Sequence, residues 1–274
     1  MRRGFTAVLV LATALALAFL LLPVVAIFLR VSPGHLFAQL GNPIARDALL
    51  VSLKTNAIAE ALILLVGTPA AYFLARRRFR GRALVITAIE LPLVLPPAVA
   101  GIALIAAFGR FQLLGGSLHA LGIDVAFTQA AVVLAILFVA SPFYLRQAIA
   151  SFEAVDGTLL DAARTLGARP HRVFFRVALP LALSGLGAGA ALAFARALGE
   201  FGATIMFAGS LRGVTQTLPL AIYAEFDLNF DVALAMGALL VIVSATILLA
   251  VKMLPRWMRS SSTSPFPFAP SISS

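Results

Sequence analysis

The residues of this chain with the most distinctive chemistry are ionisable groups inside an apolar stretch. Arg196 and Glu200 stand four positions apart, so an α-helix would present both on one face. An ionisable side chain at membrane depth is a functional candidate by default. Two interpretations are open: an internal ion pair whose charges satisfy each other, or an arginine that offers positive charge to an anion. Thr204 lies one turn beyond Glu200 and adds a hydroxyl that could line a path or a gate.

A second group of residues could open a helix rather than carry charge. Pro92, Pro96 and Pro97 fall within one apolar run, and a proline lacks the backbone N–H and disrupts a helix. In a membrane such a break is tolerated where the freed carbonyls find new partners or line a cavity. A broken helix can also present backbone N–H groups to an anion. The prolines therefore predict either a segment of a translocation path or a kink that serves packing.

Other polar and small residues in the apolar runs have structural interpretations. Glu90 is expected to make a helix contact or a hydrogen bond at a gate. Glu60, with Asn56 one turn before it, is expected to serve the structure. Gly185 and Gly189 form a small-residue face, which would pack either between two copies of the chain or within one copy.

The composition excludes several classes of protein. Of the 274 residues, 61% are hydrophobic and 12% are charged, against about 45–50% and about 25% in soluble domains. These values rule out a soluble enzyme, a disordered protein and, despite a net charge of +10, a nucleic-acid-binding module. The sequence has no cysteine, three scattered histidines and no phosphate-binding loop of the G-x-x-x-x-G-K-[ST] type. We therefore expect no metal site, no cofactor in this chain and no nucleotide hydrolysis by it.

Long uncharged runs predict the elements that hold these residues. A membrane-spanning helix needs about 20 mainly apolar residues, and six such stretches predict an all-α polytopic membrane protein. The expected spans are residues 5–29, 55–76, 83–109, 125–147, 179–208 and 232–254. The first run begins with two arginines, as a signal peptide does. Its 26 residues exceed the about 7–15 of a signal-peptide core, which favours an uncleaved span.

The distribution of positive charge predicts the orientation. Of the 21 lysines and arginines, 15 fall on the side of the two termini and five on the other, with Arg196 inside a span. Both termini are therefore expected in the cytoplasm, which agrees with an even number of spans. Residues 1–259 would form a single transmembrane domain, and the Ser/Pro-rich residues 260–274 a disordered tail.

The longest cytoplasmic loop, residues 148–178, contains a short predicted helix. Thr158 and Asp161 have the spacing of a capping box, Gly167 is a natural stop, and Pro170 can start a second short helix. A helix of about eight residues is not stable alone. It must therefore either cap its own bundle or dock into a partner subunit. Its apolar face would comprise Leu159, Ala163 and Leu166.

The same segment resembles the signature of ABC importer permeases. Residues 161–167 and 177–180 match the family pattern E-A-A, three residues, G, nine residues, I-x-L-P, with Asp161 for Glu and Val177 for Ile. In that family the segment is the coupling helix, seated in a groove of the ATP-binding subunit. The resemblance assigns this coupling role to Asp161, Ala162, Ala163, Arg164, Gly167, Leu179 and Pro180.

Three further stretches resemble the molybdate permeases within the sulfate, molybdate and tungstate group: residues 91–97, 198–204 and 217–223. The resemblance implies a type I, MetI-like fold and a homodimer of six-helix subunits in the cytoplasmic (inner) membrane of a prokaryote. It also implies two ATP-binding ABC subunits inside, which hold ATP and Mg, and a periplasmic or extracellular oxyanion-binding protein outside. The outer loop 209–231, with the amphipathic stretch 218–226, would be either a solvated rim or the surface for that protein.

The expected function is import of an oxyanion by alternating access, with molybdate as the first candidate. A sulfate/thiosulfate or tungstate permease is the alternative within the group. A stand-alone secondary transporter or channel is the alternative of another class, although no internal repeat is visible. A membrane enzyme lacks a catalytic constellation. The residues expected along the path or gate are Pro92, Pro96, Pro97, Arg196, Glu200 and Thr204.

Overall fold

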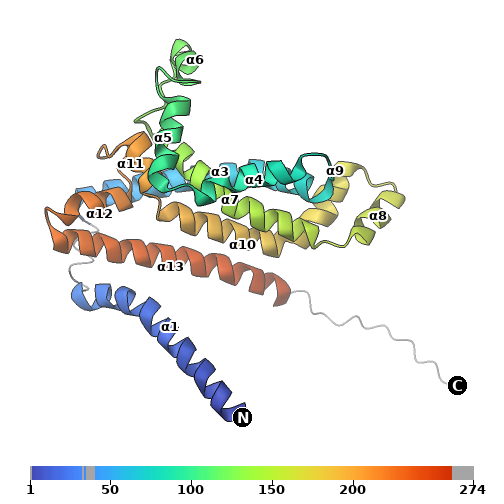
Figure 1. Ribbon diagram of the computed structural model, residues 1–274, viewed down its shortest axis with the longest axis horizontal. Helices are drawn as coiled ribbons and strands as arrows, with labels where there is room; N and C mark the ends of the chain where they lie inside the picture. The colour runs from blue at the N-terminus through green and yellow to red at the C-terminus, as the bar shows by residue number, and fades with distance from the viewer. Residues whose placement is uncertain (1, 33, 35–40, 261–274) are drawn as a thin grey trace.

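The computed structural model describes residues 2–32, 34 and 41–260, and this part of the chain is helical without a strand (Figure 1). The predicted disordered tail lies outside the described residues, except for Ser260. The elements are α1 (Arg2–Arg30), α3 (Pro43–Arg76), α4 (Arg82–Val94), α5 (Pro97–Phe108), α6 (Gly115–Ala120), α7 (Gln129–Glu153), α8 (Gly157–Thr165), α9 (Pro170–Val173), the π-helix η1 (Phe174–Ala178), α10 (Leu179–Leu198), α11 (Gly202–Ala208), α12 (Leu218–Phe226) and α13 (Phe230–Ser260).

Helix α7 forms the centre of the bundle and packs against both α3 and α10. Its Tyr144 is 1% exposed, and the phenol oxygen lies 2.6 Å from Oγ1 of Thr68 on α3. The approach of α3 depends on Gly67, where an added Cβ would lie 3.0 Å from the Tyr144 ring. Small residues at such contacts let helix backbones come close in a membrane protein.

The glycines of α10 pack within the subunit, which was one of the two alternatives. A Cβ at Gly185 would lie 2.0 Å from Oγ of Ser151, and a Cβ at Gly189 would lie 3.1 Å from Cβ of Gln147. Both partners are on α7. The small-residue face of α10 therefore belongs to the interior of one copy.

This contact predicts opposite effects at two neighbouring glycines. Gly185→Ala is expected to lower the free energy of unfolding by about 1–3 kcal/mol, because the new methyl group overlaps Ser151. Gly187→Ala has nothing within 4 Å of the new Cβ, and it should raise the stability by about 0.5–1 kcal/mol, the usual gain in a helix interior. Thermal unfolding of the two variants in detergent checks this, and equal melting temperatures would contradict it.

Among the described residues, five helices are long and apolar enough to cross a membrane, and α4 with α5 adds a sixth if this bent pair counts as one span. They follow the order of the six predicted spans, and helices α3 and α7 extend beyond the limits predicted for the second and fourth spans. Helix α3 begins at Pro43 rather than at residue 55, because Asn42 caps its first turn and a charge such as that of Lys54 does not end a helix outside lipid. Helix α7 runs to Glu153, beyond the predicted end at residue 147, so the helix extends into the predicted loop.

The third predicted span, residues 83–109, is two helices and not one. Helices α4 and α5 meet at an angle of 117°. The backbone between them is extended, with ψ of 131° at Leu95 and 136° at Pro96. Pro96 and Pro97 have no N–H to continue the helical hydrogen bonds. Pro92 lies inside α4, which continues past it to Val94, so only two of the three prolines mark the break.

The fifth predicted span, residues 179–208, is interrupted and extended. Helix α10 ends at Leu198, and Thr204 lies on the separate helix α11. At its other end α10 is preceded without a gap by η1 and α9, and Pro170–Leu198 forms one apolar helix of 29 residues. The loop predicted over 148–178 therefore shrinks to residues 154–169 apart from α8.

Helix α1 stands apart from the bundle. Its main contact is with α13, and none of its most apolar window is buried. Figure 1 shows it diverging from α13 toward its N-terminal end. The Phe19 side chain on α1 is 77% exposed. The packed core is thus formed by the later helices.

Candidate functional site

The break between α10 and α11 holds the ion pair of Arg196 and Glu200. Glu200 is 3% exposed, and its Oε1 accepts a hydrogen bond of 2.7 Å from the backbone N–H of Ala203. Its Oε2 lies 2.6 Å from Nη2 of Arg196, whose side chain stays 27% exposed. The carboxylate therefore accepts a hydrogen bond from the first turn of α11, where negative charge is favourable. It also neutralises the charge of Arg196. The internal ion pair is present, and contact of Arg196 with an oxyanion stays a prediction.

Helices α5 and α11, each of which follows a break, pack against each other in close contact. A Cβ at Gly202 would lie 2.5 Å from Cβ of Pro97, and a Cβ at Gly101 would lie 2.6 Å from Cβ of Met206. A side chain larger than hydrogen would not fit at either position. The fold thus brings Pro97, at the start of α5, next to the segment that follows Glu200.

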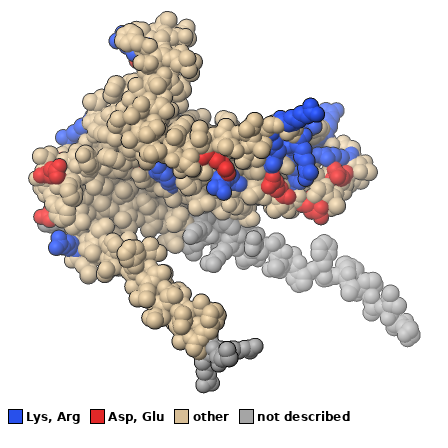
Figure 2. All heavy atoms as spheres, viewed as in Figure 1, with Lys and Arg blue, Asp and Glu red and all other residues tan. Residues whose placement is uncertain are grey.

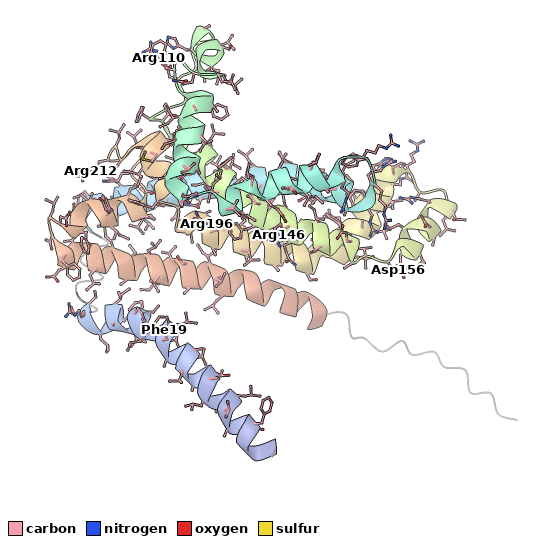
Figure 3. All side chains as sticks on the ribbon, viewed as in Figure 1. Phe19, Arg110, Arg146, Asp156, Arg196 and Arg212 are labelled. Atoms are coloured by element: carbon pink, nitrogen blue, oxygen red, sulfur yellow. The ribbon has the colours of Figure 1, made fainter. Side chains whose placement is uncertain are left out.

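Thr204 and Pro92 occupy different surroundings. Thr204 is fully buried on α11, and within the described part of the chain its Oγ1 has no hydrogen-bond partner. Pro92 is half-buried on α4 and lies away from the break. The same helix carries Glu90, whose Oε1 lies 3.0 Å from Nε of Arg146 on α7. This is the helix contact predicted for Glu90, and Figure 3 shows Arg146 and Arg196 along the length of the bundle.

Glu60 on α3 was expected to serve the structure, but its neighbour Asn56 forms its hydrogen bond elsewhere. The Asn56 Nδ2 donates to the carbonyl of Ser52 at 2.8 Å, one turn earlier on α3. Both carboxyl oxygens of Glu60 are buried, and in the described residues neither has a hydrogen-bond partner. A contact within this subunit therefore does not account for Glu60.

A polar contact that sequence reasoning missed joins α3 to α12. Ser52 Oγ accepts a hydrogen bond of 2.7 Å from the N–H of Leu218, and both residues are buried. Helix α12 coincides with the amphipathic stretch noted at 218–226. A signal existed in Pro219, because a proline in the first turn marks a helix start whose N–H groups need acceptors.

Helix α8 forms where the coupling helix was predicted, but its cap is different. The N-cap is Asp156, whose Oδ1 accepts a hydrogen bond of 2.9 Å from the Thr158 N–H, so the capping box at Thr158 was wrong. Asp161 instead pairs with Arg164 at 2.7 Å. Within this chain the fully buried residue of α8 is Leu160, and of the predicted apolar face Ala163 packs against the core. The residues of the predicted face that are exposed are Leu159, at 49%, and Leu166, at 89%.

The cap predicts a pH-dependent first turn of α8. Hydrogen bonding from the Thr158 N–H and hydroxyl lowers the pKa of Asp156 below its usual value. A carboxylate with a lowered folded pKa stabilises the turn above the unfolded pKa of about 3.9 and loses this effect as pH falls through the folded value. At neutral pH, Asp156→Ala should speed amide hydrogen exchange over residues 158–162 several-fold, whereas Asp156→Asn, also a good N-cap, should not. Unchanged exchange in the alanine variant would refute the cap.

The end of α8 follows the prediction. Gly167 has a φ of 79°, the left-handed conformation that suits glycine. The N–H of Gly167 bonds to the carbonyl of Arg164 at 2.9 Å and that of Ala168 to Ala163 at 3.0 Å, which closes the helix. Pro170 starts α9 as expected, and helix α8 contacts both α9 and η1. Leu179 and Pro180 are the first residues of α10.

These features describe a polytopic helical protein with two interrupted apolar segments and a short helix, α8, next to the end of a long apolar helix. Comparison with known families agrees: residues 67–260 match the binding-protein-dependent transport system inner membrane component. The chain belongs to this family of ABC transporter permeases. It is therefore an inner-membrane transport subunit, and in this family ATP is hydrolysed by partner subunits.

Two relatives indicate the branch of the family. The molybdenum transport system permease protein ModB of Mycobacterium tuberculosis is 47% identical over 86% of this chain and 89% of its own length. The sulfate transport system permease protein CysW of Synechococcus elongatus is 36% identical over 73% of this chain and 72% of its own length. The chain is thus similar to permeases of the sulfate and molybdate group.

Two solved structures show the fold. A bacterial alginate ABC transporter in complex with a pentasaccharide-bound periplasmic protein has a chain with a TM-score of 0.73 at 15% identity, covering 96% of this chain and 97% of that one. The methionine transporter MetNI in inward-facing form has a chain with a TM-score of 0.62 at 20% identity, covering 78% and 95%. The expected MetI-like permease fold is therefore confirmed.

Proposed function

We propose that this protein is the membrane-spanning subunit of an ATP-driven importer that moves molybdate across the cytoplasmic membrane by alternating access. The observation that supports this most is the continuous helix Pro170–Leu198. One end adjoins α8, and the other ends at the ion pair of Arg196 and Glu200. A displacement of α8 would reach the break through its contacts with α9 and η1 and then along this continuous helix. The 47% identity to a molybdenum permease supports the substrate.

The proposed assembly has two copies of this chain, with the path between them. Each α8 docks into one ATP-binding subunit, which holds ATP and Mg. An oxyanion-binding protein delivers the anion to the opposite face, and both termini of the chain lie in the cytoplasm. Substrate selection rests mainly with the binding protein, because a path must release what it conducts. The docking residues are Asp161, Ala162, Ala163, Arg164, Gly167, Leu179 and Pro180.

In each copy, the proposed path is lined by the region where α5 and α11 pack together. It is the region where two helices are broken and where an ion pair is only partly covered. The residues assigned to the path or gate are Pro92, Pro96, Pro97, Arg196, Glu200 and Thr204.

The substrate is tested in a strain that lacks this gene. We expect cellular molybdenum at trace external molybdate to fall and labelled sulfate uptake to stay normal, and the wild-type gene to restore molybdenum. The similarity to CysW makes sulfate the second candidate. Lost sulfate uptake with molybdenum retained would move the assignment to sulfate. If neither changes, the oxyanion proposal fails and the family assignment remains.

A second experiment separates an ABC permease from a stand-alone carrier. The purified chain should capture its ATP-binding subunit, and Ala163→Glu, which places a charge on the docking helix α8, should weaken the capture. Arg172→Gln on α9 is the matched cytoplasmic control. Transport by the chain alone, without an ATP-binding subunit, would overturn the proposal.

A further inference from the structure

The turn between α3 and α4 concentrates positive charge at the edge of a membrane span. The apolar helix Pro43–Arg76 ends where this charge begins. Figure 2 shows the basic side chains gathered at the end of the bundle that carries α8 and α9. A group at the end of a span lies at the level of the lipid headgroups. The arginines of this turn are Arg76, Arg77, Arg78, Arg80 and Arg82.

Two hollows open beside this turn and share Arg76. One has a volume of about 560 Å³ and is lined by Ala75, Arg76, Arg78, Arg82 and Glu153. The other, of about 550 Å³, is lined by Tyr72, Phe73, Arg76, Arg77, Arg164, Pro170 and Val173. Each hollow has three guanidinium groups, and in the two linings together Glu153 is the one acidic residue. A preference for cytoplasmic positive charge explains the number of arginines but not these two hollows.

Two of the arginines are held in place by the protein. Arg76 Nη2 donates to the carbonyl of Val155 at 2.6 Å, and Arg82 Nε donates to the carbonyl of Leu74 at 2.7 Å. Arg82 also pairs with Glu153. Among the described residues, the guanidinium groups of Arg77 and Arg78 have neither a hydrogen-bond nor an ion-pair partner, and both side chains are exposed. Fixed and free donors thus line the same hollows.

An apolar wall adjoins these donors on the side of the span. The rings of Phe73 and Phe79 lie 5.8 Å apart and are 53% and 39% exposed. Phe73 also lines the second hollow together with Tyr72. A free inorganic anion would use the guanidinium groups but not the rings, whereas a lipid would use both.

We propose that the turn between α3 and α4 binds the phosphate headgroup of an anionic phospholipid, with an acyl chain against Phe73 and Phe79. Basic pockets beside membrane helices recognise such headgroups, and guanidinium groups match phosphate oxygens with paired hydrogen bonds. Arg77 and Arg78 supply the free donors, and Arg76 supplies a fixed charge between the two hollows. The site is separate from the oxyanion path and does not depend on the identity of the transported substrate.

Native mass spectrometry of the full chain in detergent tests the site. Phosphatidylglycerol and phosphatidylethanolamine with identical acyl chains are the probes. We expect phosphatidylglycerol to be retained preferentially, and Arg77→Gln/Arg78→Gln to lower its affinity by about fivefold per arginine. The control Arg172→Gln/Arg176→Gln removes the same charge from exposed residues outside both hollows and should retain the lipid.

Three outcomes would overturn the proposal. The first is equal retention of the two lipids by the wild-type chain. The second is equal loss in the two double variants, which would mean that only overall charge matters. The third is complete displacement of phosphatidylglycerol by inorganic phosphate, which would assign the hollows to a free anion. As a further check, Phe79→Ser should weaken binding of the full lipid but not of water-soluble glycerophosphoglycerol, because only the full lipid has an acyl chain.

Discussion

Replacing Arg196 by methionine is expected to lower the free energy of unfolding by about 3–5 kcal/mol. The Glu200 side chain is 1% exposed, and without Arg196 its charge would keep only the hydrogen bond from Ala203. A buried carboxylate without its counter-ion is among the most destabilising changes that one substitution can make. Thermal unfolding in detergent measures the loss. A variant as stable as the wild type would show that the ion pair does not stabilise the fold.

The double variant Arg196→Met/Glu200→Gln separates the two roles of the arginine. Glutamine keeps an oxygen for the Ala203 N–H and has no charge, so most of the lost stability should return. Uptake then distinguishes the interpretations. If Arg196 serves only the ion pair, the double variant transports. If Arg196 contacts the oxyanion, the double variant is stable and inactive.

Gly202→Ala is expected to remove most of the uptake and to destabilise the protein by about 1–3 kcal/mol. The new methyl group would lie 2.5 Å from Cβ of Pro97, so α5 and α11 would have to move apart. Since Pro97 and Gly202 lie at the starts of α5 and α11, their separation would change the geometry of the proposed path. Uptake in whole cells, normalised to the amount of protein in the membrane, measures the effect.

Gly199→Ala is the matched control for this substitution. It lies in the same break, has the same added methyl group and has nothing within 4 Å of the new Cβ. We expect transport close to wild type. Equal loss in both variants would mean that the break tolerates no methyl group at all and that contact with Pro97 is not the reason.

The six apolar segments and their order could be predicted from hydropathy, because lipid requires an apolar helix of a certain length. The true start of α3 could not be predicted in this way. Hydropathy detects the part of a helix that lies in lipid, whereas Asn42 and Pro43 determine where the helix itself begins. The prolines predicted a disruption of the third span, but the 117° angle depends on the packing of α5 against α11.

Among the site residues, contacts between neighbours in the sequence could be predicted, and contacts between distant residues could not. The spacing of Arg196 and Glu200 was enough to predict that they could pair, although Glu200 lies two residues beyond the end of α10 and not on the helix face expected. The contact of Pro97 with Gly202 joins residues far apart in the chain, and no local pattern contains it. In α8 the helix begins at Gly157, so the side chain that caps its first turn is that of Asp156 and not that of Thr158. Whether Leu159 or Leu160 is buried depends on the surface against which α8 packs.

The π-helix η1 lies within the spacing of the predicted coupling motif and gives that spacing a geometric consequence. Nine residues separate Gly167 from Val177, and this interval contains α9 and most of η1. Successive residues of an α-helix are about 100° apart around its axis, so inserting or deleting one residue here would turn the motif by that angle relative to Glu200. A π-helix is the usual structural trace of one additional residue in a helix. The rotational phase between α9 and the break is therefore determined by residue count, and we expect changes of length within α9 or η1 to be tolerated less than changes of side chain.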